Sequence, residues 1–235
     1  MFWFKPKIKI EKEGEEVFIK YNDYTYSLFN LNNLFTQHYW DYFTPLPLLF
    51  DSPKVLIIGL GGGTIAYQIE NIFNNAKIDA IEPNEEMIKI ARQRLKRTNI
   101  LKGDGYKILN KTDKIYNIII LDAYSNDYIP EEFISREFMS NSYNHLEKRG
   151  ILAINYALTP SNIAREDKLI NYMKEFYKIY IVKNLGKSNF NEIYIGSKNV
   201  SLENEYKNLN NEITKNYPDL ITCIESYRNC INYGT

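Results

Sequence analysis

Between Lys54 and Tyr177, short apolar segments alternate with segments whose apolar residues recur at helical spacing. The expected strands are KVLIIG, KIDAIE, NILKGD, YNIIILDA and RGILAINY. Short apolar strands that alternate with helices are typical of a parallel sheet with both faces covered. The sequence therefore predicts an α/β fold with a doubly wound, mostly parallel sheet in which KVLIIG is a central strand.

The segments between these strands predict five helices. They are expected at about 64–74, over NEEMIKIARQRLKR, near GYKILN, from Glu131 to Glu147, and at about 162–177. Pro130 suits the first turn of the fourth helix, because its missing N–H costs nothing there. The later segments KIYIVKN and NEIYIGS are joined by a short turn, which predicts an antiparallel hairpin at the edge of the sheet.

The two ends of the chain have different patterns. KIKIEKEGEEVFIKYNDYTYSLF alternates with period two, which predicts a small antiparallel sheet, whereas the polar C-terminal segment has apolar residues at helical spacing. We expect three regions: a small N-terminal β-domain with its connector (1–48), a nucleoside-binding catalytic domain (49–200) and a helical extension (201–235). Five side chains are expected to serve packing: Trp3, Phe4, Trp40, Cys223 and Cys230.

The strand KVLIIG runs directly into a glycine-rich loop. Four of the chain's 11 glycines lie here, at Gly59, Gly61, Gly62 and Gly63. In a loop between a strand and a helix, bare backbone N–H groups can face a ligand that side chains would keep away. A tight turn alone would also require glycine. The loop by itself does not decide between these two explanations.

Carboxylates strengthen the ligand-binding interpretation. Glu82 ends the second expected strand, Asp104 follows the third within KGDGYKIL, and Asp122 ends the fourth. Because parallel strands end at the same edge of a sheet, these acids and the glycine loop favour a nucleoside site, with Gly105 letting the chain turn beside the ligand. The dinucleotide pattern G-x-G-x-x-G would need glycine where Thr64 stands, so nicotinamide binding is a second choice.

The same motifs, together with YNIIILDAYSNDYIPEEFISREFMSNSYNHLEKRGILAINY, resemble the spermidine synthase family of polyamine aminopropyltransferases over about residues 39–197. The resemblance implies a seven-stranded, Rossmann-like sheet of the S-adenosylmethionine-dependent methyltransferase type, preceded by a small β-domain. It also implies that Glu82 binds the ribose hydroxyls and Asp104 the adenine amino group, while the glycine loop holds the sulfonium-bearing tail. Asp122 would face the reacting amine. HYWDY lies where the family has a Tyr-His-Glu-like segment.

Two positions depart from the family pattern. The family's loop usually reads Gly-Gly-Gly-Asp-Gly-Gly, and its acid falls on Gly62. A second acid, expected three residues after Asp122, falls on Ser125. We expect Asp127 or Tyr124 to support Asp122 in binding and deprotonating a cationic amine.

Three functions remain open. Aminopropyl transfer from decarboxylated S-adenosylmethionine to a polyamine or diamine is preferred, because LDAYSNDYIPEEFISREF resembles spermidine synthases specifically. Methyl transfer from intact S-adenosylmethionine is the alternative, since Gly62 removes a repulsive charge and free loop N–H groups would attract a carboxylate. The third is a non-catalytic nucleoside-binding relative. Either nucleoside would be a co-substrate, and neither a prosthetic group nor a metal is expected.

Composition limits the partners. Lys plus Arg and Asp plus Glu both total 29, which argues against a nucleic-acid partner bound through phosphate neutralisation. No apolar run approaches the roughly 20 residues that span a bilayer, and MFWFKPKIKI lacks the features of a signal peptide. We therefore expect a cytoplasmic protein with a small-molecule amine substrate and no membrane partner. A homodimer and a homotetramer both remain open.

Overall fold

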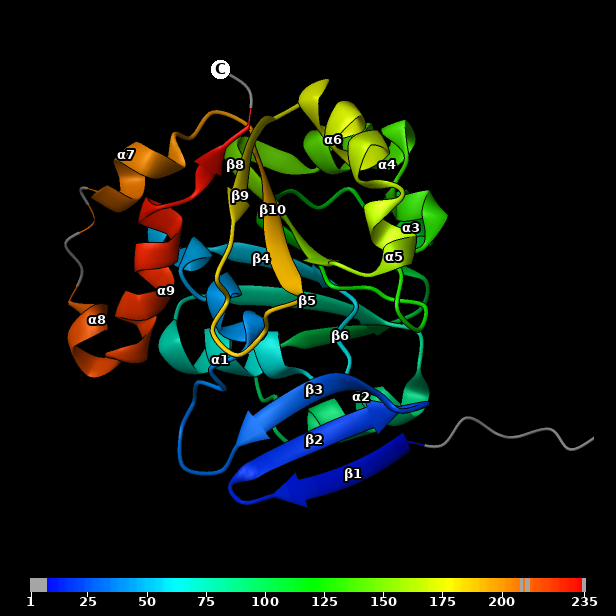
Figure 1. The fold of residues 1–235 in the computed structure, drawn as a ribbon, viewed down its shortest axis with the longest axis vertical. Coiled ribbons are helices and arrows are strands. Elements are labelled where there is room, and N and C mark those ends of the chain that lie inside the picture. The colour runs from blue at the N-terminus through cyan, green and yellow to red at the C-terminus, as the bar shows by residue number, and fades with distance from the viewer. Residues whose placement is uncertain (1–7, 208, 210–211, 234–235) are drawn as a thin grey trace, which may run out of the picture.

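The computed structural model describes residues 8–207, 209 and 212–233, so Trp3 and Phe4 lie outside the described residues. Two sheets organise the chain (Figure 1): an N-terminal antiparallel sheet and a larger sheet flanked by helices. Within the described residues the larger sheet has eight strands, in the order β11-β9-β10-β8-β7-β4-β5-β6.

The parallel part of this sheet surrounds β4. β4 (Lys54–Ile58) lies between β5 (Lys77–Glu82) and β7 (Tyr116–Leu121) and is parallel to both. β6 (Asn99–Lys102) continues the sheet beyond β5, and β8 (Leu146–Ala157) continues it beyond β7. The winding direction therefore reverses between β4 and β7, where doubly wound sheets bind their ligands. The predicted fold class and the central position of KVLIIG are confirmed.

The antiparallel part closes the other edge. β9 (Lys178–Val182) and β10 (Asn191–Ser197) form the predicted hairpin, with β10 between β8 and β9. A two-residue strand, β11 (Ile231–Asn232), pairs with β9 and adds an eighth strand to the predicted seven. A strand this short has no periodicity by which the sequence could have revealed it.

Helices cover both faces of the larger sheet. α1 (Thr64–Ile72) and α9 (Asp219–Arg228) pack on one face, and α4 (Arg136–Asn144) and α6 (Glu166–Lys174) pack on the other. Trp40 and Cys223 are buried in the first of these cores, and Cys230 is half-buried beside it, which agrees with the packing expected of them. The shorter helices are α2 (Glu85–Arg92), α3 (Gly105–Leu109), α5 (Pro160–Ile163), α7 (Leu202–Lys207) and α8 (Ile213–Asn216).

Three of the predicted helices are wrong in extent. The helix predicted over NEEMIKIARQRLKR is shorter, since α2 ends at Arg92. The segment predicted as one helix from Glu131 to Glu147 forms a 3-10 turn, η3 (Glu131–Phe133), and then α4. Ser135 between them has an extended backbone, and its side chain accepts a hydrogen bond from the Phe138 N–H, so it starts a new helix. The segment predicted as one helix over 162–177 is likewise divided into α5 and α6, at a non-helical Arg165.

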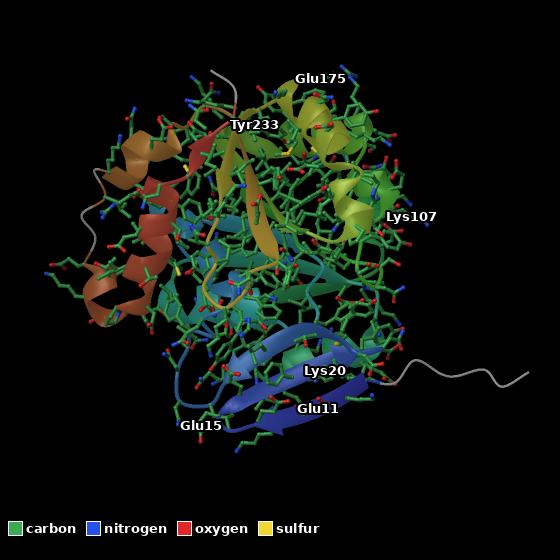
Figure 2. The ribbon with its side chains drawn as sticks, in the orientation of Figure 1. Glu11, Glu15, Lys20, Lys107, Glu175 and Tyr233 are labelled. Carbon is green, nitrogen blue, oxygen red and sulfur yellow. The ribbon has the colours of Figure 1, made fainter. Side chains whose placement is uncertain are left out.

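The N-terminal sheet lies beside α2 (Figure 1). Its strands are β1 (Ile8–Glu13), β2 (Glu16–Tyr21) and β3 (Tyr24–Asn30), paired antiparallel in that order. One face contributes Ile19 and Phe29 to a small core with Met87 of α2. Charged side chains also pair between neighbouring strands of this sheet: Lys20 on β2 is hydrogen-bonded to Glu11 on β1 (Figure 2). No helix among the described residues is both long and apolar enough to cross a bilayer.

Candidate active site

A cavity of about 410 Å³ opens at the switch point of the larger sheet. It is lined by the β2–β3 hairpin and by loops that follow β4, β5, β7 and β8. Its size is in the range of small-molecule sites. The predicted site residues that line it are Gly59, Gly61, Glu82, Asp122, Tyr124 and Asp127. Those that do not line it are Gly62, Gly63, Asp104 and Gly105.

Backbone atoms of neighbouring segments lie very close to the glycine loop. A Cβ on Gly59 would lie 2.4 Å from the carbonyl oxygen of Asp122, and one on Gly61 would lie 2.6 Å from that of Tyr26. Both glycines, and Gly63 before α1, have φ values of +54° to +98°, a region that side chains disfavour. Tight turning and close backbone approach therefore both account for these glycines.

The N-terminal sheet sits directly on the next position of this loop. The Gly62 N–H donates a 2.7 Å hydrogen bond to Ser27 Oγ on β3, and a Cβ on Gly62 would lie 2.5 Å from Ile19 Cδ1. Nearby, Thr64 Oγ1 accepts from the Leu28 N–H at 3.1 Å and donates to the Leu28 carbonyl at 3.0 Å. The Gly62 N–H, which we expected to face a ligand, is thus bonded inside the protein.

Glu82 is held at the end of β5 by backbone donors. Its Oε2 accepts from the Gly61 N–H at 2.8 Å, and its Oε1 accepts from the Asn84 N–H at 2.9 Å. Burial raises the pKa of Glu82, although these hydrogen bonds oppose the shift. Each carboxylate oxygen can accept more than one hydrogen bond, so both keep the capacity to bind a ligand hydroxyl.

Asp104 is placed at the start of α3. Its side chain accepts from the Lys107 N–H at 3.1 Å and therefore caps the helix, and it lies 3.7 Å from the Lys107 ammonium. A Cβ on the adjacent Gly105 would lie 2.3 Å from Ile58 Cγ2. Glycine at this position lets α3 approach β4 closely.

Asp122 is the most strongly perturbed acid of the cavity. It accepts hydrogen bonds from Asn155 Nδ2 at 2.7 Å and from the Tyr39 hydroxyl at 3.2 Å. Burial raises the pKa of Asp122 to about 7, although hydrogen bonds from Asn155, Tyr39 and Trp40 lower it, while the charge of Glu82 raises it further. A carboxyl group with a pKa near neutrality is well matched to accept a proton at physiological pH.

The two other predicted catalytic residues differ in their surroundings. The Tyr124 hydroxyl donates to the Asn155 carbonyl at 2.9 Å and accepts from the Ala157 N–H at 2.8 Å, so it ties the loop after β7 to β8. Asp127 lines the cavity, and its backbone carbonyl accepts from Thr159 Oγ1 at 3.0 Å. Its carboxylate forms no hydrogen bond or ion pair with the described residues.

Sequence reasoning missed much of the cavity lining, including three residues around Asp122: Tyr39, Asn155 and Asn191. Asn191 Nδ2 donates to Asn155 Oδ1 at 2.8 Å, behind the contact of Asn155 with Asp122. Two of the three had a signal, because Tyr39 lies in HYWDY and Asn155 interrupts the apolar strand RGILAINY near its carboxyl end. Asn191 opens a hairpin strand, where nothing in the local pattern indicates a site.

The cavity is acidic and aromatic. Its described lining includes the carboxylates of Glu82, Asp122 and Asp127 but no Lys, Arg or His. Five tyrosines also line it: Tyr21, Tyr24, Tyr26, Tyr39 and Tyr124. Carboxylates and aromatic faces both attract cations. Among the described residues there is no group of three or more His, Cys, Asp or Glu side chains that could hold a metal ion.

A family model described as the spermine/spermidine synthase domain matches residues 36–187, more than half of the chain. The chain belongs to the spermine/spermidine synthase family. This confirms the resemblance drawn from the glycine loop and the strand-end acids.

Among curated members of this family, a polyamine aminopropyltransferase of Vibrio vulnificus is 28% identical over 142 residues, which cover 57% of this chain and 48% of the relative. One from Streptococcus uberis is 33% identical over 117 residues, 46% of this chain and 41% of the relative. The chain thus spans less than half the length of these relatives.

Solved structures share the fold of this family member. A probable spermidine synthase from Corynebacterium glutamicum has a TM-score of 0.72 at 17% identity, covering 83% of this chain and 77% of that one. Human methyltransferase-like protein 13, solved with SAH, has a TM-score of 0.58 at 19% identity, covering 81% and 86%. The methyltransferase-like architecture is confirmed.

Proposed function

We propose that this protein transfers an aminopropyl group from decarboxylated S-adenosylmethionine to a small amine. The observation that carries the proposal is the charge of the cavity, whose described lining holds three carboxylates and no basic side chain. Both substrates of this reaction are cations. The names of the curated relatives, polyamine aminopropyltransferases, support the same chemistry.

The glycine loop favours the decarboxylated donor over the intact one. Intact S-adenosylmethionine ends in a carboxylate that needs a cation or free N–H groups. The Gly61 N–H is bonded to Glu82 and the Gly62 N–H to Ser27, so neither is available. The decarboxylated donor ends in an ammonium group, which the carboxylates of the cavity would stabilise. The missing acid at position 62 therefore does not favour methyl transfer, because that position faces the N-terminal sheet.

The acidic groups suit the steps of the reaction. The acceptor arrives as an ammonium ion with a pKa of about 10.4, and Asp122 would take its proton. The nitrogen lone pair then attacks the carbon beside the sulfonium, and the C–S bond breaks with its electron pair on sulfur, releasing methylthioadenosine. Glu82 would hold the ribose hydroxyls and Asp127 a second positive charge. Asp104, which caps α3 outside the cavity, could bind the adenine amino group only if the nucleoside extends past the end of β6.

Calorimetry and product analysis test the proposal. We expect decarboxylated S-adenosylmethionine and methylthioadenosine to bind about tenfold or more tightly than S-adenosylmethionine, and NAD not to bind. With a diamine, the decarboxylated donor should yield equal amounts of methylthioadenosine and aminopropylated amine. A methylated product from S-adenosylmethionine without aminopropyl transfer would establish the alternative activity. Binding without any transfer would establish a nucleoside-binding protein.

A further inference from the structure

Asp122, Asn155 and Asn191 form a line of hydrogen bonds along the wall of the cavity. Asn191 Nδ2 donates to Asn155 Oδ1 at 2.8 Å, and Asn155 Nδ2 donates to Asp122 Oδ1 at 2.7 Å. The antiparallel register pairs Asn155 with Ile193, so Asn191, two residues along β10, has its side chain on the same face. Asn155 is only 2% exposed, which limits competition from water.

The middle amide of this line is asymmetric. A carboxamide turned one way presents an NH2 group to a carboxylate, and turned the other way it presents a carbonyl oxygen. The first orientation stabilises a negative charge and the second repels it. If the Asn155 amide were reversed, its oxygen would face Asp122 and its NH2 group would face the NH2 group of Asn191. Both contacts would then become repulsive.

We propose that Asn191 is a positioning residue that acts on Asp122 through Asn155, by fixing the Asn155 amide with its NH2 group toward the Asp122 carboxylate. The base role of Asp122 rests on the proposed aminopropyl transfer, whereas the hydrogen-bond line does not. Asn191 thereby couples the start of β10, at the antiparallel side of the sheet, to the acid at the end of β7.

Other groups also act on Asp122 and stay in place when Asn191 is changed. Tyr39 and Trp40 donate to it from the segment before β4. The charge of Glu82 from β5 and the Tyr124 hydroxyl from its own loop also act on it. Loss of the Asn155 NH2 group should therefore shift the pKa of Asp122 upward by about one unit, not abolish its ionisation. Loss of Asn191 should give a smaller shift in the same direction, because the Asn155 amide is then oriented by Asp122 alone.

The test measures the pKa of Asp122 directly, by 13C NMR titration of aspartate carboxyl groups in the full chain. The Asp122 signal is assigned by its absence in Asp122→Asn. The variants are Asn191→Leu, Asn155→Leu and the double variant, with Asn189→Leu as the control, since Asn189 is an exposed asparagine two residues before Asn191. Asn191→Ala and Asn155→Ala repeat the test if the leucine variants do not fold. The acid limb of the kcat/KM profile is recorded for the same proteins.

The expected result is a raised Asp122 pKa in both single variants, no shift in Asn189→Leu, and a double variant equal to Asn155→Leu alone. An unchanged pKa in the Asn191 variants would overturn the proposal. Shifts that simply add in the double variant would also overturn it, because Asn191 would then act independently of Asn155. If no aminopropyl transfer is detected, the proposed function fails, but the NMR titration still decides whether the hydrogen-bond line exists.

Discussion

The backbone N–H of Gly62 donates a 2.7 Å hydrogen bond to Ser27 Oγ, which joins the glycine loop to the N-terminal sheet. The same sheet lines the cavity through Tyr21 and Tyr24 to Tyr26. A small antiparallel sheet therefore packs over the strand ends of a methyltransferase-like fold. It contacts the bare backbone of the glycine loop directly. The absence of a side chain at position 62 follows from this contact.

Gly62→Ala should destabilise the protein by about 1–3 kcal/mol, the usual cost of overpacking a buried site. The new Cβ would lie 2.5 Å from Ile19 Cδ1 and 3.0 Å from Ser27 Cβ, so the buried Ile19 side chain must repack and Ser27 must move slightly. Ile19→Val removes the Cδ1 atom, and the cost of Gly62→Ala should be smaller in that background. Urea unfolding of the four proteins in this cycle measures the coupling. Equal costs in the two backgrounds would contradict the contact.

Asp122→Asn should lower turnover about 10²–10⁴-fold, the contribution of a general base, while methylthioadenosine still binds. The same substitution should raise the stability of the folded protein at pH 8, although it lowers turnover. The folded-state pKa of about 7 lies above the ordinary value of 3.8, so wild-type stability falls as pH rises through that window. Asn removes this penalty. The variant should therefore melt at about the wild-type temperature at pH 4 and a few degrees above it at pH 8.

Melting curves from pH 4 to pH 8 check this prediction alongside the rate assay. A variant that melts below the wild type at pH 8 but keeps its activity would identify Asp122 as a structural cap of its loop. Tyr39→Phe is a matched control, because it removes one hydrogen bond to Asp122 and leaves the carboxylate in place.

The alternation of strands and helices was enough to predict the centre of the sheet, because β4 and β7 are mostly apolar and buried and parallel strands end at the same edge. By the same rule we expected Glu82 and Asp122 at one edge, and both line the cavity. Asn191 could not be found in this way, since its contact with Asn155 depends on the register between β10 and β8. The contact of Ser27 with Gly62 was equally hidden, because it joins segments that no local pattern relates.

Glu82→Gln should weaken nucleoside binding by about 1–3 kcal/mol, the range for a lost hydrogen bond to a charged group. Both carboxylate oxygens accept backbone hydrogen bonds, from Gly61 and from Asn84. Gln offers only one oxygen, so one of these N–H groups also loses its partner and the loop should loosen. Calorimetry with methylthioadenosine measures the affinity, and amide hydrogen exchange at Gly61 and Asn84 measures the loop. Unchanged affinity would count against a ribose site at Glu82.

Asn162→Ala should raise the KM for the amine acceptor several-fold and leave the affinity for methylthioadenosine unchanged. Asn162 is fully buried, and its Oδ1 accepts from the Ile129 N–H at 3.1 Å while its Nδ2 donates to the Ala157 carbonyl at 2.9 Å. It thereby fastens the loop that carries Asp127 to the end of β8. Removing it leaves the Ile129 N–H without a partner, whereas the Ala157 carbonyl still accepts from the Thr159 N–H. The unpartnered N–H should cost about 1–3 kcal/mol of stability.

Two further variants separate positioning from general destabilisation. Asn162→Asp keeps an acceptor for the Ile129 N–H, so its effect on KM should be the smaller one. It also places a second oxygen against the Ala157 carbonyl, which should lower stability. Ser161→Ala, at the exposed neighbouring position, should change neither KM nor stability. If Asn162→Ala lowers the melting temperature while the KM for the amine stays constant, the residue holds the loop without influencing the acceptor, and Asp127 does not contribute to acceptor binding through this contact.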